Sequence, residues 1–286
     1  MSCLEVYDDL EIIKELLGLT ISELADIIGV TPMTIHRWKN SEAQISAKNL
    51  NSIYDLAFRK GIRLNKIKEQ LFREECNSTD KVILFHGAKT CIDGALSIER
   101  SKSTNDFGRG FYCGESMEQS AMFVSNYPES SLYIVEFDRR NLQGIQLKID
   151  REWMLMIAYF RNRLSGYENH PIIRNILKKL EGVDYIVAPI ADNRMFEIID
   201  SFIDGEITDI QCRHCLSATN LGNQYVFVTQ RALDQAAILR HCYLAQVEKK
   251  FYLSSRQEEA KVSNDKVKIA RKKYRGVGDY IEDILA

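Results

Sequence analysis

The sequence lacks the features that mark membrane, secreted or fibrous proteins. It contains only 4 prolines in 286 residues, and its 15 glycines follow no repeat, which excludes collagen-like and low-complexity chains. The longest uninterrupted apolar run, 153–160, is far shorter than the roughly 20 residues that a transmembrane helix needs. The first residues lack the basic flank and apolar stretch of a secretory signal. We therefore expect a cytoplasmic protein with no membrane partner.

The cysteines form neither a disulfide framework nor a convincing metal site. Seven is an odd number, and these cysteines are scattered along a chain that is long enough to fold around its own core. Cys212 and Cys215 have the spacing of half a zinc site, but the other candidate pair, His241 and Cys242, is adjacent in sequence. The sequence therefore predicts reduced thiols and no bound metal.

The net charge of −2 hides a local change of sign. Residues 1–30 are mainly acidic, whereas residues 31–68 are mainly basic. Such a change within a short segment predicts a small domain with one face turned toward a polyanion. A second basic run lies at 266–275, where two interpretations stay open: it steers a nucleic acid, or it is a solvated helix face.

Two signals for helix starts lie close together near the N-terminus. Thr20 and Glu23 have the spacing of a capping box, and Gly29 is expected to end the helix that they begin. Thr31 is then a second N-cap, with Pro32 at the first helical position. The sequence predicts two short helices joined by a tight turn, preceded by a helix at 4–17 and followed by one at 46–59.

This arrangement resembles the phage-repressor-like helix-turn-helix domains of bacterial regulators. In that family the second helix enters the major groove of DNA. On the matching positions the resemblance assigns DNA contacts to Thr31, Met33, Thr34, Arg37 and Lys39. The alternative is a helical bundle that serves only dimerisation or partner docking, because Met33 and Thr34 offer few groups that read bases.

After a polar stretch at 77–80, short apolar runs alternate with helical patterns. We expect an α+β protein with an all-α helix-turn-helix domain at 1–75, a second domain at 76–250 and a charged helical C-terminal extension at 251–286. The expected strands are 82–85, 132–137, 185–188 and 225–229, and the expected helices are 116–124, 152–164, 171–180 and 194–203.

Three segments of the second domain carry a further resemblance: Leu84–Gly87, Phe107–Phe123 and Asn223–Phe227. Their order and spacing are similar to the core of the diphtheria-toxin and poly(ADP-ribose) polymerase branch of ADP-ribosyltransferases, which has a His, Tyr, Glu triad. Within that branch the chain resembles a bacterial group found near toxin–antitoxin genes. The resemblance implies a split β-sheet with helices, and NAD as co-substrate.

The resemblance also assigns roles to single residues. It implies catalytic roles for His86, Tyr112 and Gln224, and contacts with NAD for Gly87, Ser120 and Phe123. Tyr112 and Phe123 would hold the nicotinamide ring between them, worth about 1–2 kcal/mol per face. Arg109, which stands between two glycines, would contact the NAD pyrophosphate or be only a surface arginine.

Gln224 departs from the family pattern, because it stands where the catalytic glutamate is expected. A carboxylate about 4 Å from developing positive charge is worth up to roughly 4 kcal/mol at an effective dielectric near 20. Glutamine forfeits that charge but can still orient a ribose hydroxyl, and we expect Gln224→Glu to keep or raise nicotinamide release. Asp192 or Glu197 could restore the charge, and Gln230, expected on the same strand, is a second amide candidate.

These observations lead to one hypothesis and two alternatives. The hypothesis is an NAD-dependent mono-ADP-ribosyltransferase, a toxin or anti-phage defence effector that carries its own helix-turn-helix. Its acceptor would be a protein or a nucleic acid, and an antitoxin protein would be a partner. The alternatives are a transcriptional regulator whose second domain binds NAD or ADP-ribose without turnover, and an NAD glycohydrolase that uses water as acceptor.

Overall fold

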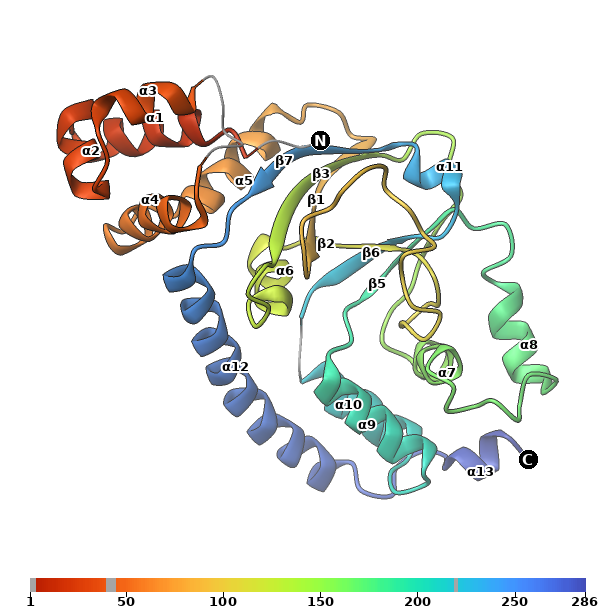
Figure 1. Ribbon diagram of the computed structural model, residues 1–286. Helices are drawn as coiled ribbons and strands as arrows, with labels where there is room; N and C mark the ends of the chain where they lie inside the picture. The colour runs from red at the N-terminus through yellow and green to blue at the C-terminus, as the bar shows by residue number, and fades with distance from the viewer. Residues whose placement is uncertain (1–3, 40–44, 219–220) are drawn as a thin grey trace. The chain divides into compact units, whose positions relative to one another are not determined.

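The computed structural model describes residues 4–39, 45–218 and 221–286 (Figure 1). These residues form two compact units, each built from separate stretches of sequence, and the presence of both helices and strands confirms the α+β class. The first unit draws on 1–94, 116–138 and 237–255, and the second unit on 95–115, 139–236 and 256–286. The domain limits expected near residues 75 and 250 stay a prediction.

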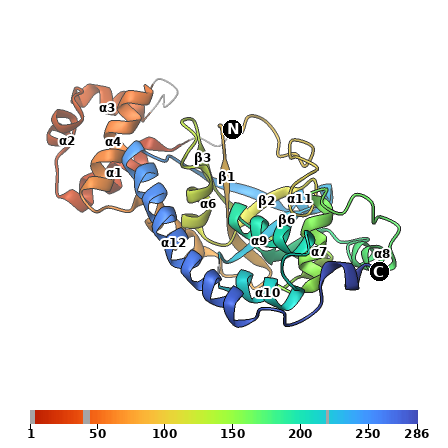
Figure 2. The ribbon, with the colours of Figure 1, turned by 90° about the horizontal axis from the view of Figure 1, so that it is seen from below.

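The first unit begins with a group of helices. They are α1 (Val6–Leu17), α2 (Ile21–Ile28), α3 (Pro32–Trp38), α4 (Ala47–Arg59) and α5 (Leu64–Glu75). Figures 1 and 2 both show α1 to α4 as one bundle. Its core contains one fully buried aliphatic residue from each of α2, α3 and α4, namely Leu24, Ile35 and Ile53. Because each helix contributes an apolar side chain to the same core, burying these side chains holds the three helices together.

The helix-turn-helix predicted from the two caps is confirmed. The backbone N–H of Glu23 donates to Thr20 Oγ1 at 3.2 Å, and the backbone N–H of Thr20 donates to Glu23 Oε2 at 2.8 Å, which completes the capping box. Gly29 ends α2 with a φ of 82°, in the left-handed region that glycine tolerates best. Thr31 Oγ1 then accepts a hydrogen bond from the Thr34 N–H at 3.2 Å and starts α3.

The first unit also contains three strands and one more helix. The elements are β1 (Lys81–Ala88), β3 (Ser131–Asp138), β7 (Ala236–Cys242) and α6 (Met117–Val124). Strand β3 lies between β1 and β7 and runs antiparallel to β1, with Phe85 opposite Ile134. Met117 and Ala121 of α6 pack in one core cluster with Phe85 and Ile134, so α6 covers one face of this sheet.

Residues that follow β7 complete the packing of the N-terminal helices. Asn65 Nδ2 donates to the backbone oxygen of Tyr243 at 2.9 Å, and the ring of Tyr243 stacks on Tyr54 with centroids 5.0 Å apart. Beside them, Lys68 Nζ donates to the carboxylate of Asp9 at 2.6 Å, and both side chains are buried. The polar stretch at 77–80 is therefore not the only connection between the N-terminal helices and the rest of the first unit.

The second unit contains four neighbouring strands and most of the remaining helices. The strands are β2 (Phe111–Gly114), β4 (Gly144–Gln146), β5 (Tyr185–Pro189) and β6 (Asn223–Phe227), in the order β4-β5-β6-β2. The pair β4–β5 is parallel, and the pairs β5–β6 and β6–β2 are antiparallel. The helices are α7 (Arg151–Phe160), α8 (Pro171–Lys178), α9 (Asn193–Ile203), α10 (Asp209–Ser217), α11 (Gln230–Leu233) and α13 (Ile281–Ile284). Helix α12 (Gln246–Lys273) has residues in both units.

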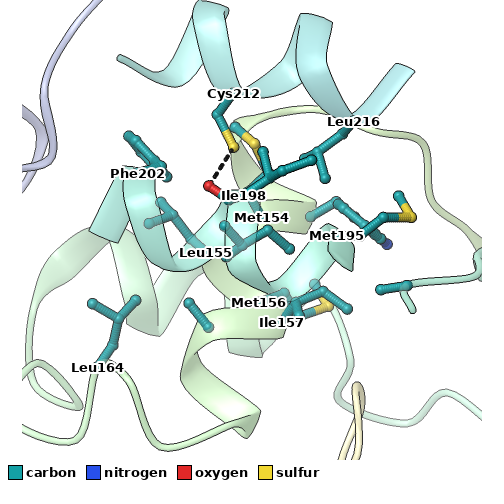
Figure 3. Close-up of a cluster of buried hydrophobic side chains, with 14 of the residues drawn as sticks. Met154, Leu155, Met156, Ile157, Leu164, Met195, Ile198, Phe202, Cys212 and Leu216 are labelled. Carbon is teal, nitrogen blue, oxygen red and sulfur yellow. Dashed lines mark hydrogen bonds between the residues drawn. The ribbon is translucent and has the colours of Figure 1, made fainter. Parts of the chain in front are cut away.

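Helices α7, α9 and α10 form the core of the second unit (Figure 3). Leu155 of α7, Phe202 of α9 and Leu216 of α10 are all fully buried. The Cys212 thiol of α10 points into this core and donates to the Ile198 oxygen at 3.6 Å, and its burial raises its pKa well above the ordinary value. Cys212 and Cys215 are therefore buried packing residues.

The basic run near the C-terminus takes part in the same core. Ala270 of α12 is buried there, together with Ile281 and Ile284 of α13. Arg271 donates through Nη2 to Ser201 Oγ at 2.7 Å, and its backbone oxygen accepts from Gln211 at 2.6 Å. Through these residues the extension forms part of the second unit.

Two expected element ends are wrong. Helix α7 ends at Phe160 rather than near residue 164, and Asn162 just beyond it has a φ of 62°, which breaks the helix. Strand β6 ends at Phe227, and Thr229 caps the short helix α11. Gln230 therefore begins a helix and does not lie on the strand of Gln224.

Candidate functional site

His86 and Gly87 lie near the end of β1, as expected. His86 pairs with Tyr133 of β3, and their rings are 6.4 Å apart between centroids. Gly87 lies directly against α6, because a Cβ at this position would be 2.6 Å from the backbone oxygen of Ser120 and 2.9 Å from a methyl group of Val124. Packing alone therefore requires glycine here, and a contact with a carboxamide stays a prediction.

Ser120 and Phe123 lie on α6, next to this strand end. The Ser120 hydroxyl is buried and donates to the backbone oxygen of Phe85 at 3.1 Å, so it fixes the helix on β1. Phe123 is 39% exposed. Its exposed ring can serve as a stacking surface, whereas the Ser120 hydroxyl would have to exchange its present bond to reach a ligand.

Tyr112 and Gln224 come from the paired strands β2 and β6 of the second unit. Tyr112 lies opposite Val226, and Gln224 lies opposite Gly114. Because alternate residues of a strand share a face, the side chains of Tyr112 and Gln224 lie on the same face as diagonal neighbours. The structure therefore brings these two predicted residues together.

The Tyr112 hydroxyl holds the loop that precedes its own strand. It accepts from the backbone N–H of Phe107 at 3.2 Å and donates to the backbone oxygen of Gly108 at 2.7 Å. Burial raises the pKa of Tyr112 far above its ordinary value, and the nearby negative charge of Asp106 raises it further. The hydroxyl thus stays protonated and remains a hydrogen-bond donor.

The sequence interpretation missed Asp106, which lies beside Gln224. Gln224 Nε2 donates to Asp106 Oδ2 at 3.0 Å and to the backbone oxygen of Pro189 at 3.3 Å. The other oxygen of Asp106 accepts from Arg161 Nη2 at 2.8 Å, and the Arg161 guanidinium lies 3.2 Å from the ring centroid of Phe196. Asp106 and Gln224 are 6% and 7% exposed, so this is a buried amide–carboxylate pair.

One signal could have pointed to Asp106. It directly precedes the Phe-Gly-Arg-Gly-Phe-Tyr segment, so the tight turn of that segment holds it near Tyr112.

Asp192, the first alternative source of negative charge, caps its own helix. Its oxygens accept hydrogen bonds from the backbone of Arg194 and Met195 and from the Arg194 side chain. Glu197 is exposed on α9.

Arg109 closes the same loop. Its guanidinium donates to the backbone oxygens of Glu99 at 2.9 Å and of Ser101 at 2.8 Å, and about half of its side chain is exposed. These bonds give Arg109 a structural role, and a contact with a pyrophosphate stays a prediction.

The seven residues assigned to NAD fall into two sets. His86, Gly87, Ser120 and Phe123 belong to the first unit, whereas Arg109, Tyr112 and Gln224 belong to the second.

The residues assigned to DNA lie on α3 and at its two ends. Thr31 and Thr34 are engaged with each other, with their hydroxyl oxygens 2.9 Å apart. Met33 is 61% exposed, and Arg37 is exposed one turn further along the helix. Lys39 is exposed as well, and its Nζ lies 5.1 Å from the ring centroid of Tyr7. The exposed side of α3 therefore presents one large apolar group and two cations.

Comparison with known families gives two matches. Residues 82–238 match the family described as protein of unknown function (DUF3990), and this region makes up more than half of the chain. The chain belongs to this family. Residues 10–53 match the helix-turn-helix family, which supports DNA binding by the N-terminal region. No curated protein and no solved structure matches the chain.

The two matches cover both candidate sites. The region shared with the family of unknown function contains Asp106 and every residue that we assigned to NAD, and the helix-turn-helix match contains every residue assigned to DNA. The family description names no activity, so the transfer of ADP-ribose stays a prediction. Among the described residues, no helix is long and apolar enough to span a membrane, and no three His, Cys, Asp or Glu side chains are grouped as metal ligands.

Proposed function

We propose that this chain is an NAD-dependent mono-ADP-ribosyltransferase with a DNA-binding helix-turn-helix. The observation that carries the proposal is the buried pair of Gln224 and Asp106 on the face of the sheet that also bears Tyr112. Burying a carboxylate and an amide is costly unless each is bonded, and here the two bond to each other while Arg161 donates to the second oxygen of the carboxylate. The pair stands at the position that the resemblance assigns to the catalytic acid.

The chemistry of NAD cleavage fits these groups. The bond between ribose and nicotinamide breaks through a state in which the sugar gains positive charge, so an enzyme must bind that state more tightly than intact NAD. Because Gln224 Nε2 faces two acceptors, its carbonyl oxygen is the end that can accept a bond from a ribose hydroxyl. The negative charge of Asp106 lies directly behind it.

Other side chains would bind and orient the co-substrate. In this proposal the ring of Tyr112 stacks on the nicotinamide, and the roles that the resemblance gives to His86 and Phe123 stay predictions. Replacing Tyr112 by Ala would remove the stacking surface, at a cost of roughly 2–4 kcal/mol in binding or transition-state free energy. The helix-turn-helix would bring the enzyme to DNA, so that DNA or a DNA-bound protein is the acceptor that we favour.

The biological role that we propose follows from the resemblance rather than from the site. A bacterial ADP-ribosyltransferase of the group found near toxin–antitoxin genes would act as a toxin or as a defence effector against phage. Such a protein needs an inhibitor in the cell that makes it, which would be an antitoxin protein. Induced expression of the chain in bacterial cells, compared with Tyr112→Ala and scored by cell growth, tests this role.

The enzymatic proposal is tested by incubating the full chain with NAD. Mass spectrometry would follow free nicotinamide, free ADP-ribose and adducts on the chain itself, on added duplex DNA and on RNA. We expect nicotinamide and an ADP-ribose adduct, both formed at least about 30-fold more slowly by Tyr112→Ala and at an unchanged rate by the control Tyr167→Ala, whose side chain is 42% exposed. Intact NAD after prolonged incubation would contradict the proposal.

Two other outcomes would select the alternatives. Nicotinamide with free ADP-ribose and no adduct would indicate a glycohydrolase. Binding of NAD without cleavage, accompanied by a change in affinity for DNA, would indicate a regulator. The regulator is the second candidate because Gln224 keeps one oxygen that can accept a hydrogen bond but lacks the charge and the second acceptor oxygen of the expected glutamate.

A further inference from the structure

Asp106 and Gln224 form a hydrogen-bonded pair of side chains in the second unit. Each oxygen of Asp106 accepts from one strong donor: Oδ2 from Gln224 at 3.0 Å, and Oδ1 from Arg161 at 2.8 Å. The side chain of Arg161 is 34% exposed, whereas that of Asp106 is 9% exposed. The carboxylate is therefore the buried member, and the arginine connects it toward solvent.

This environment fixes the orientation of the Gln224 amide. Its nitrogen faces two acceptors, the Asp106 carboxylate and the backbone oxygen of Pro189. Turning the amide around would place its own oxygen against both acceptors and leave three acceptors without a donor, which buried groups do not tolerate. The carbonyl oxygen is thus held facing away from Asp106.

We propose that Asp106 is a positioning residue for Gln224 and supplies the negative charge that the glutamine lacks. The proposal depends on the proposed NAD chemistry. The carboxylate holds the amide through a charge-assisted bond, which polarises it and makes its carbonyl oxygen a stronger acceptor for a ribose hydroxyl. The negative charge therefore comes from Asp106, whereas the hydrogen-bonding group comes from Gln224. The two residues lie 118 positions apart in the sequence.

The division predicts how substitutions combine. Gln224→Glu alone would place a second carboxylate where the amide nitrogen now lies, about 3 Å from Asp106, so the two negative charges would repel each other until one of the acids takes up a proton. This reverses the expectation from the sequence that Gln224→Glu keeps or raises activity. Combining Asp106→Asn with Gln224→Glu moves the negative charge from position 106 to position 224. The new amide at position 106 can then donate a hydrogen bond to the new carboxylate.

The experiment measures nicotinamide release by the full chain and three variants: Asp106→Asn, Gln224→Glu and the double variant. We expect Asp106→Asn to lower kcat about 10–100-fold, which is the effect of losing one hydrogen bond to a charged group, with KM changed less than about threefold. Gln224→Glu should lower kcat at neutral pH and recover as the pH falls, because a shared proton restores the bond between the acids. The double variant should exceed Gln224→Glu at least about tenfold at neutral pH.

The control separates positioning from stability. Asp184→Asn removes another buried carboxylate of the second unit, which pairs with Arg231 and accepts from Thr229 at 2.8 Å. It should lower the melting temperature without changing kcat of the protein that stays folded. The recovery of Gln224→Glu at low pH keeps the test valid even where Asp106→Asn folds poorly. The other groups that face the pair are the Arg161 guanidinium and the Tyr112 hydroxyl, and burial raises the pKa of Tyr112 far above its ordinary value.

The outcomes distinguish this inference from the proposed function. Release by the wild-type chain with an unchanged kcat in Asp106→Asn would refute the positioning role alone. A double variant no better than the weaker single variant would refute the division of roles. Absence of nicotinamide release from the wild-type chain would refute the proposed function, and the positioning role with it.

Discussion

Glu248 offers a test of how the helix-turn-helix is held in the first unit. This residue of α12 is 6% exposed, and its carboxylate accepts from Asn65 Nδ2 of α5 at 3.2 Å and from the Tyr252 hydroxyl at 3.4 Å. Burial raises its pKa from 4.5 to about 7, against the bonds from Asn65 and Tyr252 and the charges of Arg63 and Lys68. Glu248→Gln keeps an oxygen for Asn65 and removes the titration.

The sign of the effect follows from the raised pKa. The folded chain binds the proton of the Glu248 carboxyl group more tightly than the unfolded chain does. The stability that this proton contributes is therefore lost as pH rises from about 4.5 to about 7. The shift corresponds to about 3 kcal/mol. His241 acts in the opposite direction, because burial and then the charge of Lys68 lower its pKa from 6.5 to about 4, and stability rises with pH over that window. The two trends nearly cancel in the wild-type chain.

Glu248→Gln should therefore reveal the trend of His241. We expect the unfolding free energy of the variant to exceed that of wild type by an amount that grows as pH rises. The difference should reach about 3 kcal/mol at pH values above 7. Urea unfolding of protein labelled with 5-fluorotryptophan measures this, because Trp38 reports on the first unit and Trp153 on the second. The control is Glu258→Gln, the same change at an exposed position of α12.

A pH-independent difference between Glu248→Gln and wild type at the Trp38 signal would refute this reasoning. A change at the Trp153 signal alone would refute it as well, since Glu248 belongs to the first unit.

Three further predictions follow from other parts of the chain. Gly87→Ala should lower the unfolding free energy by about 1–3 kcal/mol, since its Cβ would meet the α6 backbone; Gly166→Ala, which meets nothing within 4 Å, should not, and equal values in urea unfolding would contradict this. Replacing Arg37 and Lys39 by Ala should reduce the salt dependence of duplex binding by about one phosphate contact each, and an unchanged slope would argue against this docking. Deleting 264–286 should destabilise the second unit, because Ile281 and Ile284 lie in its core, and an unchanged melting temperature would show that these contacts matter little.

Local signals in the sequence predicted the helix-turn-helix well. A capping box and a threonine before proline fix where α2 and α3 begin, because each cap satisfies backbone N–H groups that the helix leaves free. The strands β1, β3, β5 and β6 were predicted from their apolar and β-branched runs. Strand β7 was not, because its residues are mostly only partly buried and show no alternation.

Helix α5 escaped prediction for a different reason. It buries Asn65, Lys68 and Glu69 while Leu71 is 46% exposed, so its buried face is largely polar, unlike that of an ordinary amphipathic helix. The buried polar groups find partners in distant segments: Asp9 for Lys68, and residues 243 and 248 for Asn65. Asp106 is a similar case, because its proposed role depends on the hydrogen bond from Gln224, and the two residues are close together only in the folded chain. Pairing between distant polar residues leaves no periodic signal in the sequence.

The packing of α5 bears on how DNA binding should be tested. The core of the N-terminal helices includes Ala245, which is fully buried, and the stacked ring of Tyr243, both far from these helices in sequence. A fragment of residues 1–75 would lack both, and it would expose Asn65 without its partner Glu248. Absence of duplex binding by that fragment would therefore reflect an incomplete core as readily as a missing function. Duplex binding should be measured on the full chain, where failure at low salt would leave the helix-turn-helix as a module for protein partners.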